Sequence, residues 1–283
     1  MIASKQGIDL GRASGVKSLR PFPSAACKVI GLISGDSVDY REVSQVLVAD
    51  AAFSSQVLRV ANSALLGARH EVKSIVQALS LMGMDRLRSL VVTVAVNNYT
   101  SHGDNAFLRC SWRHNLGAAL WCEVLAEHCN VAKPLGYTAG MLHDIGRIAL
   151  MMVFPNDYAK FLSDGVTGDL DRLEAERKFC DADHCQVGEY LAESWNFPAA
   201  LVDVIAHHHD EVTRETPRLR LLVQAGCTAA SMSGFATVGA ESDWEPSRIV
   251  DMMPHGGDRL LPRCEDLLEK VVWKFNEIEC SLL

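Results

Sequence analysis

Apolar residues recur at helical spacing along most of this 283-residue chain, and that periodicity restricts the folds open to it. The i, i+3, i+4 pattern is clear in residues 53–65, 75–82, 85–95 and 107–131. No Asn-Gly or Asp-Gly turn lies between two alternating runs, as a β-hairpin would require. We therefore expect an all-α protein made of two packed helical subdomains.

Four segments follow from the breaks in this pattern. Residues 1–18 are polar and glycine-rich, which predicts a flexible leader. Residues 19–100 are expected to form an N-terminal helical subdomain, and a polar break follows them. Residues 105–232 are expected to form a second helical bundle. Residues 233–283 begin with a stretch rich in Gly, Ser and Pro, so we expect an irregular segment and then a C-terminal helix.

Charge and composition exclude several classes of function. The formal net charge is -8, which argues against general nucleic-acid binding, because such proteins usually carry a basic surface. No run of eighteen apolar residues predicts a membrane span, and the start lacks the apolar segment of a secretory signal. The nine cysteines contain no CxxC motif, so we expect free thiols and a cytoplasmic location.

Several histidines interrupt the apolar helices. His143 and Asp144 stand side by side in a segment that reads as one buried helix ending near residue 153. Both types of side chain are costly to bury without a partner, and both are ligands of first-row metals. Three other helices also bring candidate ligands, so the candidate metal ligands are His114, His143, Asp144, His184, His208 and His209.

Two interpretations of these histidines stay open. A mixed His and carboxylate set suits one divalent transition metal such as Fe, Mn, Zn or Ni, which could activate water for phosphoester hydrolysis. Alternatively, a histidine in a helix is most often a hydrogen-bonded core or surface group. The run 207–210 ends a helix, where histidines also interact favourably with the helix dipole.

The motifs together resemble the HD superfamily of metal-dependent phosphohydrolases, and within it the HDOD (HD-related output domain) branch of bacterial signalling proteins. Residues 143–147 read HDIGR inside an apolar run. The segment 50–64 is similar to the branch's "DP-x-L…LL-x-x-ANSA" pattern, and 194–198 followed by two histidines is similar to "W-x-LP…HH". The resemblance covers roughly residues 19–232. It implies that the second subdomain is an HD-like helical bundle.

The resemblance also implies roles for individual residues. In catalytic relatives, the HD-GYP phosphodiesterases, positions matching His143, Asp144, His184, His208 and His209 bind metal, and His114 falls near a further ligand position. Arg147 replaces the lysine of HDxGK and is a candidate phosphate-binding cation. The chain departs from the pattern where a closing Asp is expected, because it has Ala225-Gly226 there, and no GYP motif follows His209.

We therefore expect a signal-transduction output or response-regulation module that acts through protein contacts and retains part of the HD metal site. Its expected partners are signalling proteins, and a homodimer is compatible with this role. Two alternatives remain open. One is a metal-dependent phosphohydrolase acting on a nucleotide or cyclic dinucleotide, and the other is a non-catalytic sensor of a small ligand or nucleotide.

Overall fold

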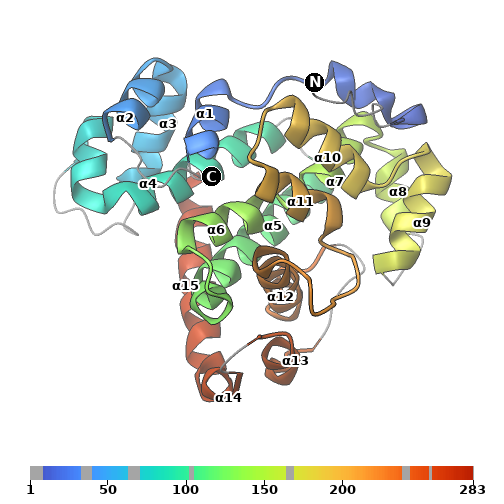
Figure 1. Ribbon diagram of the computed structural model, residues 1–283. Coiled ribbons are helices and arrows are strands. Elements are labelled where there is room, and N and C mark those ends of the chain that lie inside the picture. Colours follow the sequence, from blue (N-terminus) through green and yellow to red (C-terminus); the bar gives the residue numbers. More distant parts are fainter. Residues whose placement is uncertain are drawn as a thin grey trace, which may run out of the picture.

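Every regular element in the described part of the computed structural model is a helix, so the predicted all-α class is confirmed. The described residues are 9–32, 40–62, 71–101, 105–163, 169–237, 243–254 and 257–282. Figure 1 shows short helices at one side, a central group of helices, and a long C-terminal helix running past both.

The N-terminal group is built around one long helix. Helices α1 (Ser24–Leu32), α2 (Tyr40–Val48) and α3 (Ala51–Ala61) pack against α4 (Ile75–Thr100) (Figure 1). Asp50 caps α3 and Ser74 caps α4, each accepting a hydrogen bond from a backbone N–H in the first turn. Gly83 has φ 78° and ψ 171° and kinks α4 where the sequence predicts a break between two helices.

Helix α5 (Ala106–Leu125) forms the centre of the second group. Helices α6 (Lys133–Leu142) and α12 (Arg218–Met232) pack on it, and α4 contacts both α5 and α6, which joins the two groups. The single helix expected over 107–131 is shorter. A 3-10 turn, η3 (Ala126–Cys129), follows α5, and Asn130 then ends it in the left-handed conformation.

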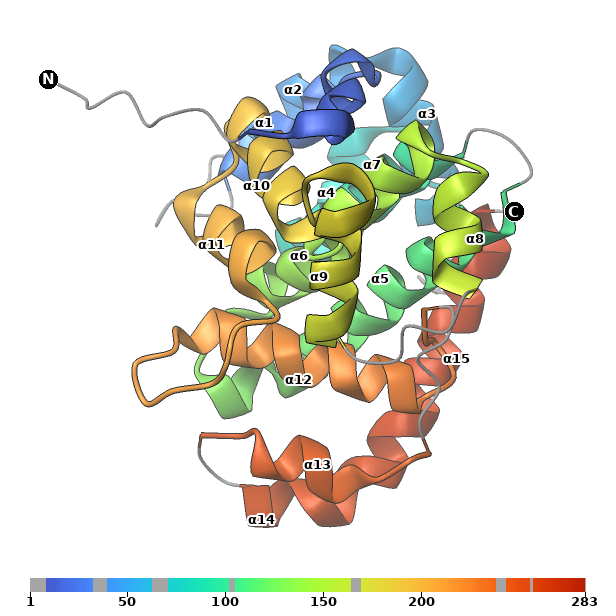
Figure 2. The same ribbon diagram turned by 90° about the vertical axis from the view of Figure 1, so that its right-hand side faces the viewer.

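Two further sets of helices complete this group. Helix α7 (Ile145–Val153) packs on α10 (His184–Ser194), which also contacts α11 (Ala199–His207). Helices α8 (Asp157–Ser163) and α9 (Asp169–Cys180) lie at the outer edge of the molecule (Figures 1 and 2). Asp183 caps α10 with a capping box to Gln186.

Part of the expected flexible leader is structured. Residues 1–8 lie outside the described part of the chain, but η1 (Gly11–Ser18) is a 3-10 helix that packs on α7 and α9. Leu10, Ala13 and Val16 are buried, and the backbone N–H of Arg12 donates to Asp181. The prediction of a flexible leader for residues 11–18 is therefore wrong: three buried apolar side chains, each three residues from the next, anchor this segment.

The C-terminal region is also more regular than expected. The stretch predicted to be irregular contains α13 (Pro246–Asp251), and α14 (Gly257–Leu260) and η4 (Leu261–Arg263) precede α15 (Cys264–Leu282). The amphipathic α15 buries Val271, Phe275 and Ile278 and packs on both α5 and α3. No helix in the described ranges has the length and apolar character needed to cross a membrane.

Candidate metal centre

His143 and Asp144 lie at a corner between α6 and α7, not inside one continuous helix as the sequence predicts. The corner lets α7 approach α10 closely. A Cβ on Gly146 would lie 2.5 Å from the backbone nitrogen of Gly188 and even closer to the carbonyl oxygen of His184. Because the backbone turns here, the two adjacent side chains can face the same site, which a straight helix would separate by about 100°.

His143 and His208 present ring nitrogens that have no hydrogen-bond partner. The Nδ1 of His143 donates to the carbonyl oxygen of Gly140 at 2.7 Å, and Nδ1 of His208 donates to that of Ile205 at 3.1 Å. In the neutral ring, each of these bonds places the lone pair on Nε2, as in metal-binding histidines. Both Nε2 atoms and Asp144 Oδ1 are buried without a hydrogen bond.

The spacing of these atoms is compatible with a single metal ion. Two ligand atoms bound to a tetrahedral zinc at about 2.0–2.1 Å lie roughly 3.3–3.4 Å apart. Asp144 Oδ1 lies 3.3 Å from His208 Nε2 and 3.4 Å from His184 Nε2. Ligand atoms of His143, Asp144 and His208 all lie within 4.8 Å of one another. This His/Asp cluster can therefore hold a metal ion.

His184 is oriented by a buried carboxylate. Glu176 Oε2 accepts hydrogen bonds from His184 Nδ1 at 2.7 Å and from the His184 backbone N–H at 2.8 Å. The hydroxyl of Tyr158 donates to the other carboxylate oxygen. A carboxylate behind an imidazole is the usual support of a metal-binding histidine, because it fixes the ring and directs Nε2 at the ion.

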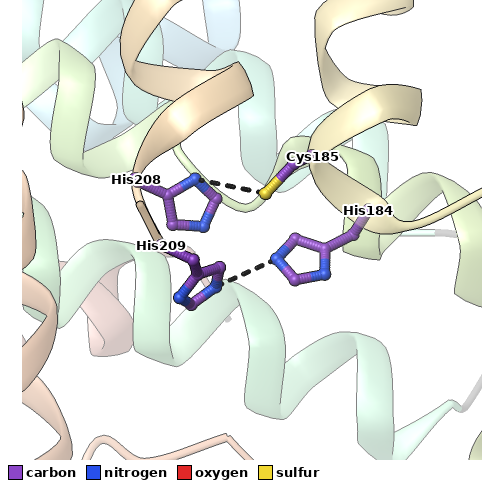
Figure 3. Close-up of side chains that lie close together, drawn as sticks. All are labelled: His184, Cys185, His208 and His209. Atoms are coloured by element: carbon purple, nitrogen blue, oxygen red, sulfur yellow. Dashed lines mark hydrogen bonds between the residues drawn. The ribbon is translucent and has the colours of Figure 1, made fainter. Parts of the chain in front are cut away.

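His209 and Cys185 extend the cluster on one side. His209 Nε2 lies 3.1 Å from His184 Nε2, and Cys185 Sγ lies 3.9 Å from His208 Nδ1 (Figure 3). His184 and Cys185 begin α10, whereas His208 and His209 follow the end of α11, so two helix ends meet here. These four side chains form a second group with potential ligand atoms within 4.8 Å.

Arg147 lies within this cluster and contacts two of its members. Its Nη1 is 2.9 Å from Asp144 Oδ2, its Nη2 is 3.3 Å from His184 Nε2, and its guanidinium also donates to Thr237. Arg147 is buried, and so is Arg172, which donates to the same Thr237 hydroxyl. The expected phosphate-binding cation thus already has protein partners on several sides.

His114 joins the cluster from α5. Its Nδ1 lies 2.8 Å from the carbonyl oxygen of Phe235, its Nε2 lies 3.3 Å from Cys227 Sγ on α12, and its ring lies 5.3 Å from that of His143. The structure therefore brings all six candidate ligands into one continuous group. His114, His143, Asp144, His184 and His208 are each at most 3% exposed.

Burial and close charges together set the pKa values of this cluster. Burial lowers the pKa of His143 to about 3, which keeps it neutral. Burial acts the same way on His208, but Cys185 and Asp144 outweigh it and raise the pKa of His208 to about 9. Burial opposes ionisation of Asp144 as well, yet the positive charge of Arg147 holds its pKa well below its usual value. The carboxylate is therefore ionised at neutral pH.

Several contributors were not predicted from the sequence: Tyr158, Arg172, Glu176, Cys185, Cys227 and Thr237. One signal was available for Arg172 and Glu176. Both lie on the same face of α9 as the buried residues Leu173 and Cys180, so charged residues occupy positions in phase with the core. Cys185 and Cys227 gave no such signal, because cysteine is common in ordinary cores.

A family model for the HDOD domain matches residues 19–211, which is more than half of the chain. The chain belongs to the HDOD family. The match includes the corner at His143 and Asp144 and both helix ends that carry His184, His208 and His209. It ends before α12, so Cys227 lies outside it.

Solved structures with the same fold are similar over almost the whole chain. One is a protein from Shewanella amazonensis SB2B named "Putative phosphohydrolase", with a TM-score of 0.71 and 24% identity, covering 96% of this chain and 99% of that one. Another, named "Putative signal transduction protein", is from Marinobacter aquaeolei VT8, with a TM-score of 0.72 and 16% identity, covering 96% and 68%. At these identities the likeness establishes the HDOD fold.

The curated sequence relatives are longer proteins. An uncharacterized protein from Treponema pallidum is 20% identical over 201 residues, which are 70% of this chain and 39% of that protein. The HDOD chain described here thus spans less than half the length of this relative.

Proposed function

We propose that this HDOD chain is a regulatory signalling module that holds one divalent transition metal and acts through contacts with other signalling proteins, without turnover. The observation that carries the proposal is the position of Arg147. Its guanidinium lies against Asp144 and His184 inside a cluster whose main side chains are at most 3% exposed. A resident cation opposes the binding of a second metal there, and the burial separates the cluster from solvent, from which a substrate phosphate would have to enter.

The donor set supports one ion. His143, Asp144 and His208 would hold it through the three buried atoms that lack hydrogen bonds, with His184 beside them. Imidazole and carboxylate donors suit Fe, Mn, Zn or Ni. A bound metal would supply a buried positive charge. The protein residues would tie the corner between α6 and α7 to the end of α11, so metal occupancy would set how firmly these helices hold together.

The lack of a carboxylate on α12, at Gly226, supports the proposed absence of turnover. Gly226 stands where the resemblance predicts a closing carboxylate, and a Cβ there would lie 3.1 Å from the carbonyl oxygen of Ala118 and still closer to Cys122 Sγ. A side chain fits at this position only if the Cys122 thiol turns aside and the backbone of Ala118 gives by a few tenths of an ångström. The proposed signalling role is also supported by the fold shared with the Marinobacter protein.

A metal-dependent phosphohydrolase is the second candidate, and Arg147 and Arg172 favour it. Two buried guanidinium groups donate to one hydroxyl, Thr237, and such pairs also bind phosphate oxygens well. In that case the metal would acidify a water molecule and the arginines would stabilise phosphate charge. A nucleotide or cyclic dinucleotide is the expected substrate class.

Two measurements on untagged protein distinguish the candidates. Elemental analysis is expected to find about one transition metal per chain, which Asp144→Ala abolishes and the exposed control Asp210→Ala retains. A phosphodiesterase screen with added Mn²⁺ and Fe²⁺ is expected to show no turnover. Turnover that vanishes in Asp144→Ala would establish the phosphohydrolase, and protein free of metal would overturn the metal part of the proposal.

A further inference from the structure

A second set of ligand atoms lies on the α12 side of the cluster. His114 on α5, His143 at the corner after α6, and Cys227 on α12 each offer an atom, and these atoms lie within 4.8 Å of one another. Neither Cys227 nor Cys185, which lies against His208 on the other side of the cluster, was a candidate from the sequence. Cys227 is half-buried, whereas the two histidines are buried.

The two imidazoles are already arranged as ligands. Nδ1 of His114 donates to the carbonyl oxygen of Phe235, and Nδ1 of His143 donates to that of Gly140. Each ring therefore has its lone pair on Nε2. The His114 Nε2 lies 3.3 Å from Cys227 Sγ, and the His143 Nε2 is buried with no hydrogen bond. An unpartnered buried nitrogen is costly, and an ion would satisfy it.

The packing of α12 explains why the sulfur is there. Gly226 packs tightly on α5, since its hypothetical Cβ would meet the Cys122 thiol and the carbonyl oxygen of Ala118. The next residue is turned by about 100° around the helix, and its thiol reaches His114. The side chain that α12 presents to His114 is therefore the thiol of Cys227.

We propose that His114, His143 and Cys227 form a site for a thiophilic metal ion such as Zn²⁺ or Co²⁺, bound through two imidazoles and one thiolate. Binding displaces the thiol proton to solvent and forms a metal–sulfur bond, with no change of oxidation state. The site shares His143 Nε2 with the His143–Asp144–His208 set, so that nitrogen binds one ion in one set at a time. The inference does not require the proposed signalling role.

Cobalt spectroscopy tests this site, because a Co²⁺–thiolate bond gives an intense near-ultraviolet charge-transfer band. Titration of metal-free protein with Co²⁺ is expected to give this band, which Cys227→Ser abolishes and the exposed control Cys280→Ser retains. A band that survives Cys227→Ser overturns the inference. Cobalt bound without the band also overturns it, but leaves the metal site of the proposed function standing. Circular dichroism melting verifies that both variants are folded.

Alkylation of the wild-type chain gives a test without substitutions. Residue-resolved mass spectrometry after brief treatment with a maleimide should show that one equivalent of Zn²⁺ slows the labelling of Cys227 at least tenfold. The exposed Cys280 should be labelled at the same rate with and without the metal. Equal labelling of Cys227 in both states would show that its sulfur does not bind the ion.

Discussion

The guanidinium of Arg147 lies 2.9 Å from the carboxylate of Asp144, and both side chains are almost completely buried. A buried ion pair is weak evidence of net stability, but removal of one partner leaves an uncompensated charge. This asymmetry makes the pair a sensitive probe of whether another cation, such as a metal ion, is also present.

Arg147→Met should therefore destabilise the metal-free protein by about 3–5 kcal/mol, because the Asp144 carboxylate loses its closest cation. Urea unfolding in the presence of a chelator measures this loss. Added metal should recover part of it by supplying the missing charge. Arg214→Met, at an exposed position, serves as the control and should change little. Equal losses with and without metal would argue against an ion beside Asp144.

Glu176→Gln should weaken metal binding by about 10–100-fold, since a carboxylate behind a ligand imidazole orients it and raises its basicity. Isothermal titration with Zn²⁺ gives the affinity. Glu174→Gln, an exposed change on the same helix, is the matched control. An unchanged affinity in Glu176→Gln would exclude His184 from the ligand set.

The metal-free protein should be most stable near pH 6.5. Below that pH the unfolded state protonates His143, whose pKa is about 6.5 when unfolded, while the folded state resists until about 3, so stability falls as pH falls. His208 acts in the opposite sense. Its folded pKa of about 9 gives stability that is complete below 6.5 and is lost as pH rises through 9.

Denaturant unfolding at a series of pH values in chelator measures both limbs. His143→Asn should flatten the acid limb, and His208→Asn should flatten the alkaline limb. If both variants keep the wild-type pH profile, the two imidazoles do not titrate in this way and the cluster has a different protonation pattern.

Gly226→Asp should destabilise the protein and should not create a second metal site. Even Gly226→Ala is expected to cost about 1–3 kcal/mol, because its Cβ would overlap Cys122 and crowd the backbone of Ala118. Gly31→Ala on α1 is the control, since nothing lies within 4 Å of its hypothetical Cβ. Thermal melting compares them, and a stable Gly226→Asp that binds two metals would contradict the proposed absence of turnover.

Much of the fold could be predicted from the sequence because helix periodicity and helix caps are local signals. Asp50, Ser74 and Asp183 cap the helices that their positions predict, and Gly83 breaks α4 where expected. The corner after Leu142 could not be predicted in this way. Its cause is the close contact of Gly146 with Gly188, which are 42 positions apart, and apolar periodicity continues through it.

The residues of the candidate site also fall into two groups, those recognisable from local sequence and those placed by tertiary packing. His114, His143, Asp144, His184, His208 and His209 were visible as ligand-type residues within apolar helices, and the structure places them together. Glu176, Cys185 and Cys227 join them only through tertiary packing, since each lies on a different helix from the atom it faces. The sequence around a cysteine in a helix does not indicate which residue its sulfur will contact.

The 3-10 helix η1 has a mechanical consequence. It rests on α7 and α9, the two helices that carry Arg147 and Glu176. Its contacts are firm, as a Cβ on Gly15 would already overlap Val153 of α7, and Arg12 donates to the carbonyl oxygen of Phe179 on α9. A displacement of residues 11–18 would therefore shift α7 and α9, and with them the charged side chains that contact the histidines. In the same way, a rearrangement at the histidines would be transmitted to residues 11–18.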